Sequence, residues 1–269
     1  VSGGKTVLIS GLDISGAQHD NLADYDGGIY VYGDGTLTIE NSHIHNNESY
    51  FGAGISLREN ATLNLSNNTE IYNNSSISDG GGIFCSSSDI NAKNIKIGRK
   101  EGEQVQGNIS TQPDSKGAAI AAYSCCVYRG NSPLGTGAVE INYNLSNNAA
   151  VYLNNSALLF SEEGSQMKFN GNPEENQSVY NTALLADNSA IQLTNVEITD
   201  NYLGTVIEIE NESDLSMYSD CKGKSCSKLS RNAGIALFVN LNSTAYLQQT
   251  IISDNLESPL LVTSVEPDA

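Results

Sequence analysis

The sequence predicts an all-β fold, a right-handed, single-stranded parallel β-helix in which three short strands per coil wind into about nine stacked coils. Two short signatures alternate along the chain and indicate an internal repeat. The apolar residues also come in short alternating runs such as Thr36–Ile39, without a long stretch of helical periodicity. The composition agrees, with 25 Gly, 5 Pro and no Trp. We therefore expect one elongated domain over residues 1–269.

The first signature is a pair of small residues followed by an aliphatic residue, as in Gly27-Gly28-Ile29 and Ala53-Gly54-Ile55. A missing or minimal side chain lets the backbone bend tightly, and glycine also tolerates a positive φ. This signature therefore predicts one corner of each coil. The predicted corner residues are Gly28, Gly54, Gly82, Ala119, Ala138 and Gly234.

The second signature is an apolar residue followed three positions later by Asn, as in Ile71-Tyr-Asn-Asn74. Asn accepts the left-handed backbone conformation and bonds to nearby backbone groups. Stacked Asn amides can also bond to one another from coil to coil, which satisfies them when they are buried. The signature therefore predicts a structural column of asparagines at another corner. Its predicted members are Asn47, Asn74, Asn172, Asn201, Asn232 and Asn255.

A third apolar run lies between the two signatures, for example Leu37–Ile39 and Leu63–Leu65. Each repeat thus offers three strands, and stacking must supply the core because a single coil cannot bury its own apolar face. Three segments break the pattern, near residues 98–117, 123–136 and 161–181. We expect them to be inserted loops, which on solenoids often carry the binding function.

The five cysteines favour disulfides and hence an oxidising, extracellular compartment. Cys221 and Cys226 bracket a short polar loop and predict a local bridge. Cys85 and the adjacent Cys125 and Cys126 lie in neighbouring repeats, so stacking can bring two of them together, and the sequence leaves that pairing open. A metal site is the rival interpretation, but these cysteines lack a CxxC spacing and a nearby His.

The net charge is −18, from 13 basic and 31 acidic side chains. Such a charge repels nucleic acids and anionic lipid, so no nucleic-acid partner is expected. No run of 18 apolar residues is present, and the segment is not expected to insert into a membrane. Both ends lie within a repeat, so we expect a fragment of a longer chain. We also expect it to be monomeric.

Many parallel β-helix proteins are enzymes that degrade polysaccharides, so the sequence could contain catalytic groups of that kind. A hydrolase needs two suitably spaced carboxylates, and a lyase needs a Lys or Arg base with a cation. The nearest candidates are the acidic group Asp24, Asp26 and Asp34 and the basic group Lys93, Lys96, Arg99 and Lys100. The paired-Asp, Gly-His-Gly and Arg-x-Lys motifs of pectin hydrolases are absent. His43 and His45 lack a clear third metal ligand. No catalytic residue, cofactor or metal site is therefore assigned.

The alternating signatures resemble the GGA(I/L/V) and FxxN repeats of polymorphic outer-membrane proteins, which are surface adhesins with a β-helical passenger of the autotransporter type. The resemblance covers roughly residues 25–260. Only Phe169-Asn-Gly-Asn172 has the family's Phe, and most small pairs lack its Ala. The resemblance implies a bacterial cell-surface or extracellular location and a host protein or glycan as partner.

These observations lead to the hypothesis of a non-catalytic, cell-surface or secreted binding module, an adhesin passenger whose loops contact a host protein or glycan. Tyrosines expected on the surface suit such contacts, because they bury area at low entropic cost. They are Tyr30, Tyr32, Tyr50 and Tyr72. Two alternatives stay open: a polysaccharide lyase or glycoside hydrolase acting in a groove on the β-helix, and an architectural spacer.

Overall fold

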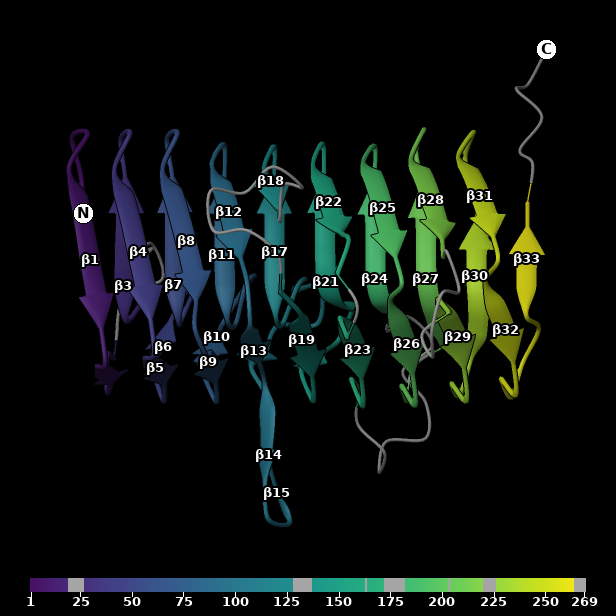
Figure 1. Ribbon diagram of the computed structural model, residues 1–269, viewed down its shortest axis with the longest axis horizontal. Coiled ribbons are helices and arrows are strands. Elements are labelled where there is room, and N and C mark those ends of the chain that lie inside the picture. Colours follow the sequence, from purple (N-terminus) through teal and green to yellow (C-terminus); the bar gives the residue numbers. More distant parts are fainter. Residues whose placement is uncertain are drawn as a thin grey trace.

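The computed structural model describes residues 1–18, 27–127, 137–162, 164–171, 182–202, 204–219 and 226–263. Within them the chain forms strands and turns and no helix. Three parallel sheets of nine strands each run along the whole stack (Figure 1). A four-stranded parallel sheet and a two-stranded antiparallel hairpin complete the fold. The predicted parallel β-helix with three main strands per coil is confirmed.

The strands are grouped here by sheet. Sheet A contains β1 (Thr6–Ser10), β4 (Thr36–Glu40), β8 (Thr62–Ser66), β12 (Asp89–Ala92), β18 (Cys126–Val127), β22 (Ala157–Phe160), β25 (Ala190–Thr194), β28 (Asp214–Tyr218) and β31 (Thr244–Gln248). Sheet B contains β2 (Asp13–Ser15), β5 (His43–His45), β9 (Thr69–Tyr72), β13 (Ile95–Ile97), β19 (Val139–Asn142), β23 (Gln166–Lys168), β26 (Glu197–Thr199), β29 (Lys228–Ser230) and β32 (Ile251–Ser253). Sheet C contains β3 (Ile29–Tyr32), β7 (Ile55–Arg58), β11 (Ile83–Ser86), β17 (Ile120–Tyr123), β21 (Ala149–Asn154), β24 (Thr182–Asp187), β27 (Thr205–Glu210), β30 (Ile235–Val239) and β33 (Leu260–Val262).

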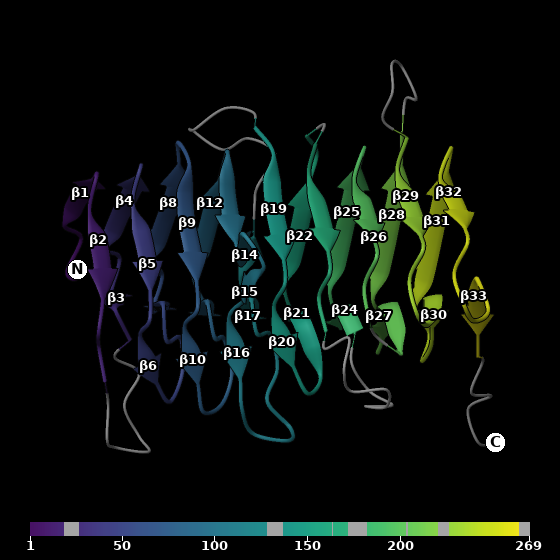
Figure 2. The same ribbon diagram turned by 90° about the horizontal axis from the view of Figure 1, so that it is seen from below.

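The two smaller sheets lie outside this scheme. Sheet D contains β6 (Glu48–Ser49), β10 (Ser75–Ser76), β16 (Ile109–Ser110) and β20 (Leu145–Ser146). The hairpin consists of β14 (Arg99–Glu101) and β15 (Gln104–Gln106). In each coil the chain passes through sheet A, then sheet B, then sheet C before it returns to sheet A one coil further on. Figures 1 and 2 together show that this path is right-handed, as parallel connections almost always are.

The core lies inside the coil and is built from rows of like residues. In β4, Leu37 and Ile39 are fully buried while the alternate side chains point outward. Leu37 pairs in register with Leu63 of the next coil, and the same stacking of aliphatic on aliphatic recurs in the other sheets. Burying such a side chain contributes about 1.5–3 kcal/mol. Strict alternation therefore fixes which face of each strand turns inward.

A ladder of asparagine side chains occupies the turn that follows each sheet B strand, called here the ladder corner. The Nδ2 of Asn74 donates to the Oδ1 of Asn108 at 3.0 Å, and the backbone N of Asn74 donates to the same oxygen at 3.2 Å. The pattern repeats from coil to coil. The column comprises Asn47, Asn74, Asn108, Asn144, Asn170, Asn201, Asn232 and Asn255.

Two details of this corner differ from the sequence prediction. The ladder position assigned to Asn172 is filled by Asn170, and Asn172 lies outside the described residues. The left-handed conformation belongs to the residue before seven of the eight ladder asparagines, for example Asn73 with φ 53° before Asn74; Gly107, which precedes Asn108, is the exception. The left-handed residue turns the chain, so the following Asn points its amide into the corner.

The small-residue corner lies before the sheet C strands, and its cause is close packing. A Cβ on Gly82 would lie 2.6 Å from the carbonyl oxygen of Ala119 in the next coil. The positive φ falls two residues earlier, at Gly80. One assignment is wrong: Ala138 directly precedes β19 of sheet B and is not at this corner. The small residue at the corner of that coil is Ala150, which precedes Val151, the sheet C partner of Ile120.

The predicted insertion over residues 98–117 is smaller in the structure. The hairpin of β14 and β15 projects from the stack (Figure 1), and Asn108 already rejoins the ladder. In the segment 123–136, residues 128–136 lie outside the described residues. In the segment 161–181, β23 belongs to sheet B, and residues 163 and 172–181 lie outside the described residues.

Cys85 and Cys125 form a disulfide between coils, with a Cα–Cα distance of 6.4 Å. Cys126 is a free, partly exposed cysteine on the outer side of the strand. This choice follows from alternation, because consecutive strand residues face opposite sides and only Cys125 turns inward. Cys221 lies outside the described residues, so its bridge to Cys226 stays a prediction.

Candidate functional site

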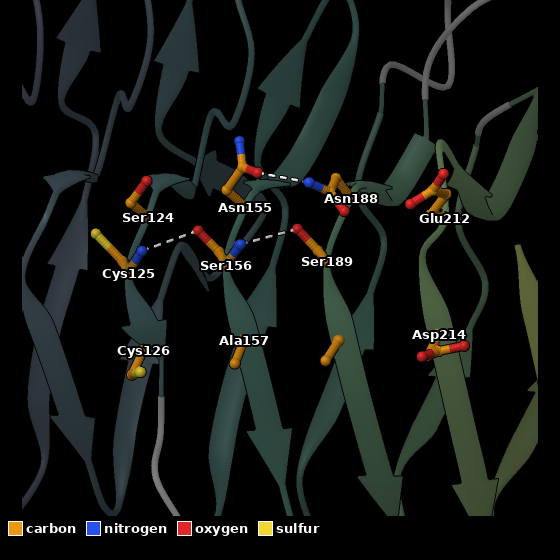
Figure 3. Close-up of a pocket in the computed structure, with 11 residues that line it drawn as sticks. Ser124, Cys125, Cys126, Asn155, Ser156, Ala157, Asn188, Ser189, Glu212 and Asp214 are labelled. Carbon is orange, nitrogen blue, oxygen red and sulfur yellow. Dashed lines mark hydrogen bonds between the residues drawn. The ribbon is translucent and has the colours of Figure 1, made fainter.

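The turn that leads from sheet C to sheet A, called here the groove corner, contains a second ladder made of serines. Five of these turns have a left-handed residue followed by Ser, as in Asn155 with φ 48° before Ser156. The backbone N of Cys125 donates to the Oγ of Ser156 at 3.0 Å, and the backbone N of Ser156 donates to the Oγ of Ser189 at 3.0 Å (Figure 3). Ser156 and Ser189 are buried, so this ladder stabilises the turns beneath the surface of the corner.

A shallow, open groove lies over this corner (Figure 3). Its lining residues are Ser124, Cys125, Cys126, Asn155, Ser156, Ala157, Asn188, Ser189, Ala190, Glu212 and Asp214. Adjoining depressions share several of these residues and extend the groove onto both neighbouring sheets. On the side of sheet C the surface continues over Asp187 and Asn211, and on the side of sheet A over Leu159 and Gln192. We call the whole surface the corner groove.

The floor of the groove is a shelf of small side chains. Cys126, Ala157 and Ala190 pair in register on the outer face of sheet A. Asp89 and Asp214 flank them in the same row. Four strand spacings separate these two carboxylates, or about 19 Å at the usual strand distance. A hydrolase pair needs carboxylates within about 9.5 Å, so these two do not form one.

The rim of the groove consists of exposed amides. The Nδ2 of Asn188 donates to the Oδ1 of Asn155 at 2.6 Å, and the Nδ2 of Asn155 donates to the Oδ1 of Asn154 at 2.8 Å. An amide nitrogen carries two N–H groups. Among the described residues each of these two amides therefore uses one N–H and keeps the other toward solvent.

The charge of the groove is purely acidic among its described lining residues. Glu212 and Asp214 lie on it, and Asp187 lies on its extension, where Asn154 and Asn211 each donate to it at 2.8 Å. No Lys or Arg belongs to the described lining. Such a surface accepts hydrogen bonds from hydroxyl groups and repels anionic ligands.

A separate carboxylate pair lies on the outer face of sheet C. Glu208 and Glu210 point from the same face of β27, and Glu210 pairs in register with Asp187. Burial, followed by the charge of Glu210, raises the pKa of Glu208; burial, followed by the charge of Asp187, raises the pKa of Glu210. Lys116 has the opposite, smaller effect on Glu210. Neither glutamate lines the corner groove.

Two of the four basic residues singled out in the sequence, Lys96 and Arg99, pair with Glu70. Arg99 donates to Glu70 at 2.7 Å, and Lys96 lies 3.7 Å from the same carboxylate. The Arg99 guanidinium also lies 3.6 Å from the ring centroid of Tyr72. These contacts anchor the base of the hairpin. The expectation that Tyr72 is exposed was wrong, because only 6% of it is accessible.

The histidines lie on the outer face of β5, with Ile44 buried between them. His45 stacks on Tyr72 with ring centroids 4.8 Å apart and contacts Asp13. In the described part of the chain no three His, Cys, Asp or Glu side chains gather as a metal site would require. Asp24 and Asp26 lie outside the described residues.

The chain matches no protein-family model, no curated protein and no solved structure. Within the described residues, no helix has the length and apolar character needed to cross a membrane. The functional conclusion therefore depends on the groove itself. The sequence analysis missed this groove, although the small residues at Cys126, Ala157 and Ala190 begin three successive strands of one sheet and were a usable signal.

Proposed function

We propose that this chain is a non-catalytic binding module of a cell-surface or secreted protein and that it holds a glycan in the corner groove. One observation carries the proposal: the groove is open and presents exposed amides, carboxylates and small side chains, with no cation among its described lining residues. Sugar hydroxyls exchange hydrogen bonds with amides and carboxylates. The C–H faces of a sugar ring fit against Ala157 and Ala190.

The direction of the groove favours an extended ligand. Asn155 and Asn188 come from successive coils and lie along the axis of the stack, as do Ala157 and Ala190. A polymer that follows the axis meets an Asn on the rim and an Ala on the floor in each of two successive coils, about 4.8 Å apart. Because the coils are locked by core rows and ladders, the groove is preorganised and loses little conformational entropy on binding.

The charge favours neutral or amino sugars over uronates. The chain carries a net charge of −18, and the described groove adds carboxylates without a compensating cation. A polyuronate or a sulfated glycan would bring like charge to this surface. The adhesin-passenger interpretation agrees with this ligand class, and the Cys85–Cys125 disulfide agrees with a location outside the cell.

Isothermal titration calorimetry with soluble neutral, amino-sugar and uronate oligosaccharides tests the proposal. We expect binding of a neutral or amino-sugar chain and none of the uronate. The double substitution Asn155→Ala/Asn188→Ala should weaken binding about tenfold, the effect of losing one or two hydrogen bonds to the ligand. Asn41→Ala is the matched control, because Asn41 is an exposed left-handed residue at another corner. Equal affinity of the double variant and the control would overturn the proposal.

A second candidate function, hydrolysis of a glycosidic bond, is favoured by the Glu208 and Glu210 pair. Side chains two apart on a strand are separated by about 6.6 Å, which is within the range of an inverting carboxylate pair. A carboxyl group whose pKa is raised is suited to act as a general acid. Release of reducing ends from the bound oligosaccharide, abolished by Glu208→Gln or Glu210→Gln, would support this function. No release by the unmodified protein would exclude it.

A further inference from the structure

A pair of stacked aromatic rings stands at the ladder corner, away from the corner groove. Tyr143 follows β19, and Phe169 follows β23 in the next coil. Their ring centroids are 5.1 Å apart and their planes differ by 9°. Both residues are partly exposed. The two rings therefore form a small aromatic platform on the surface of the stack.

Both residues hold a backbone conformation that aromatic side chains rarely adopt. The φ of Tyr143 is 63° and that of Phe169 is 56°. Asn46, Asn73, Asp200 and Asp254 occupy the same turn position in four other coils and Arg231 in a fifth, and Asn and Asp are the residues that tolerate this conformation best. Aromatic rings in these two coils are thus an unfavourable choice for the turn. Unfavourable backbone conformations concentrate at functional sites, which suggests a use for the rings beyond folding.

Polar groups border the platform on the outer face of sheet B. The Nδ2 of Asn142 donates to Glu140 at 3.3 Å, and the Nε2 of Gln166 donates to the same carboxylate at 2.9 Å. Burial, with smaller effects from the charges of Tyr202 and Glu140, raises the pKa of Tyr143. Tyr202 itself is 43% exposed. The platform thus combines the partly exposed surface of two stacked rings with hydrogen-bonding neighbours.

We infer that Tyr143 and Phe169 form a second glycan subsite that binds the face of a neutral sugar ring, with Glu140 and Gln166 available to its hydroxyls. Aromatic faces carry partial negative charge and pack against the C–H groups of a sugar ring. The neighbouring carboxylate accepts from hydroxyl groups and disfavours an anionic sugar. The ligand class rests on the proposed function. The location does not, because the platform and the corner groove occupy different corners of the coil.

The test uses substitutions that suit the turn better than the native residues. Asn is introduced in the double variant Tyr143→Asn/Phe169→Asn, which should keep or raise the midpoint of urea unfolding. The same variant should bind a panel of neutral hexasaccharides (glucose, galactose, mannose and N-acetylglucosamine oligomers) at least tenfold more weakly by calorimetry. Tyr143→Phe should retain the affinity, because the ring and not the hydroxyl makes the contact.

Each outcome separates this inference from the proposed function. Loss of affinity in the platform variant with full affinity in Asn155→Ala/Asn188→Ala supports the platform and contradicts the groove. The reverse result contradicts the platform and supports the groove, and loss in both variants supports both surfaces. A lower urea midpoint for the platform variant would show that the rings stabilise the turn, and would overturn the inference. Failure of the unmodified protein to bind any hexasaccharide would overturn both.

Discussion

The ladder corner and the groove corner have similar turns, but the polar side chains of the first are buried and several of those at the second are exposed. In both, a left-handed residue is followed by a polar side chain that receives a hydrogen bond from the coil before it. At the ladder corner that side chain is Asn, and Asn74 and Asn108 are completely buried. At the groove corner it is Ser, and the exposed Asn155 and Asn188 lie outside the serine ladder.

The length of the ladder side chain explains the difference. An Asn amide spans the distance to the next coil and also bonds to the backbone, so its donors and acceptors are used within the protein. A Ser hydroxyl is shorter: Ser156 Oγ accepts from the backbone N of Cys125 and donates to backbone carbonyls, so the serine ladder bonds only to the backbone and the amides of the turn remain at the surface. Repeated polar residues are therefore structural where they are buried, and they are available to a ligand where they are exposed.

Removing a ladder amide should have the largest effect. In Asn108→Ala, the backbone N and the Nδ2 of Asn74 lose their shared acceptor, and the carbonyl of Ile71 loses one of its two donors. Buried groups left unpaired cost about 1–3 kcal/mol each, so we expect a loss of about 3–5 kcal/mol in the free energy of unfolding, measured in urea. Asn155→Ala at the groove corner should lower it by only about 1 kcal/mol, because Ala adopts the left-handed conformation of Asn155 less readily than Asn does. Equal losses would remove the distinction between the corners.

Reducing the Cys85–Cys125 disulfide should have the next largest effect. Cys125 occupies a position of the serine ladder, because its backbone N donates to the Oγ of Ser156. Where other coils have a Ser hydroxyl, Cys125 has a sulfur that is bonded to Cys85, 40 residues earlier in the sequence. Closing a loop of this length stabilises by about 2–4 kcal/mol, so reductant should lower the free energy of unfolding by that amount. Cys126→Ser should show the same difference between oxidised and reduced protein. A variant insensitive to reductant would mean that Cys126 is the bridging residue.

Removing one serine rung should weaken the groove corner by less than the loss at the ladder corner. In Ser156→Ala the backbone N of Cys125 loses its acceptor and the carbonyl of Asn154 loses a donor. We expect a loss of about 1–2 kcal/mol in urea unfolding. Ser124→Ala, at an exposed position of the same corner, is the control. A loss as large as that of Asn108→Ala would contradict the weaker role given to this ladder.

The smallest effect on the free energy of unfolding should come from protonation of Asp200 at the ladder corner. Hydrogen bonds from Arg231 at 2.6 and 2.7 Å lower the pKa of Asp200. A carboxyl group with a lowered folded-state pKa stabilises the protein above its unfolded-state pKa, and this contribution disappears as the pH falls through the folded-state value. Because 57% of the Arg231 side chain is exposed, screening limits it to about 0.5 kcal/mol.

Urea midpoints at pH 7 and near pH 2 measure this contribution. The unmodified protein should lose slightly more stability on acidification than Arg231→Gln. If both lost the same amount, the pair would contribute nothing, and charge would play no part in the difference between the corners.

Much of the fold could be predicted because the signal repeats. The alternation of apolar and polar residues in Thr36–Ile39 fixes the inward face, and the apolar-x-x-Asn spacing marks the ladder. The same spacing at Ile141–Asn144 and Met167–Asn170 identifies two further ladder residues that the sequence analysis overlooked. Asn108 was hidden for a different reason: the hairpin interrupts its coil, and the Val105 that precedes it is exposed.

The candidate sites were harder to predict because they depend on neighbours from different coils. Ala157 and Ala190 are 33 residues apart, and only their register on sheet A makes them one shelf. The stacked rings of Tyr143 and Phe169 likewise arise from register and from an unfavourable turn conformation. Neither feature has a local sequence pattern of its own.

By itself, the sequence determined that the chain is a parallel β-helix with a column of asparagines, because side-chain alternation and turn preferences act over a few residues and recur in every coil. The tertiary structure alone decided which cysteine bridges to Cys85, where the left-handed residues fall and which polar side chains stay exposed. The physical reason is register: each of these outcomes depends on how a residue is aligned with its counterpart one coil away, and that alignment is set by the packing of the whole stack.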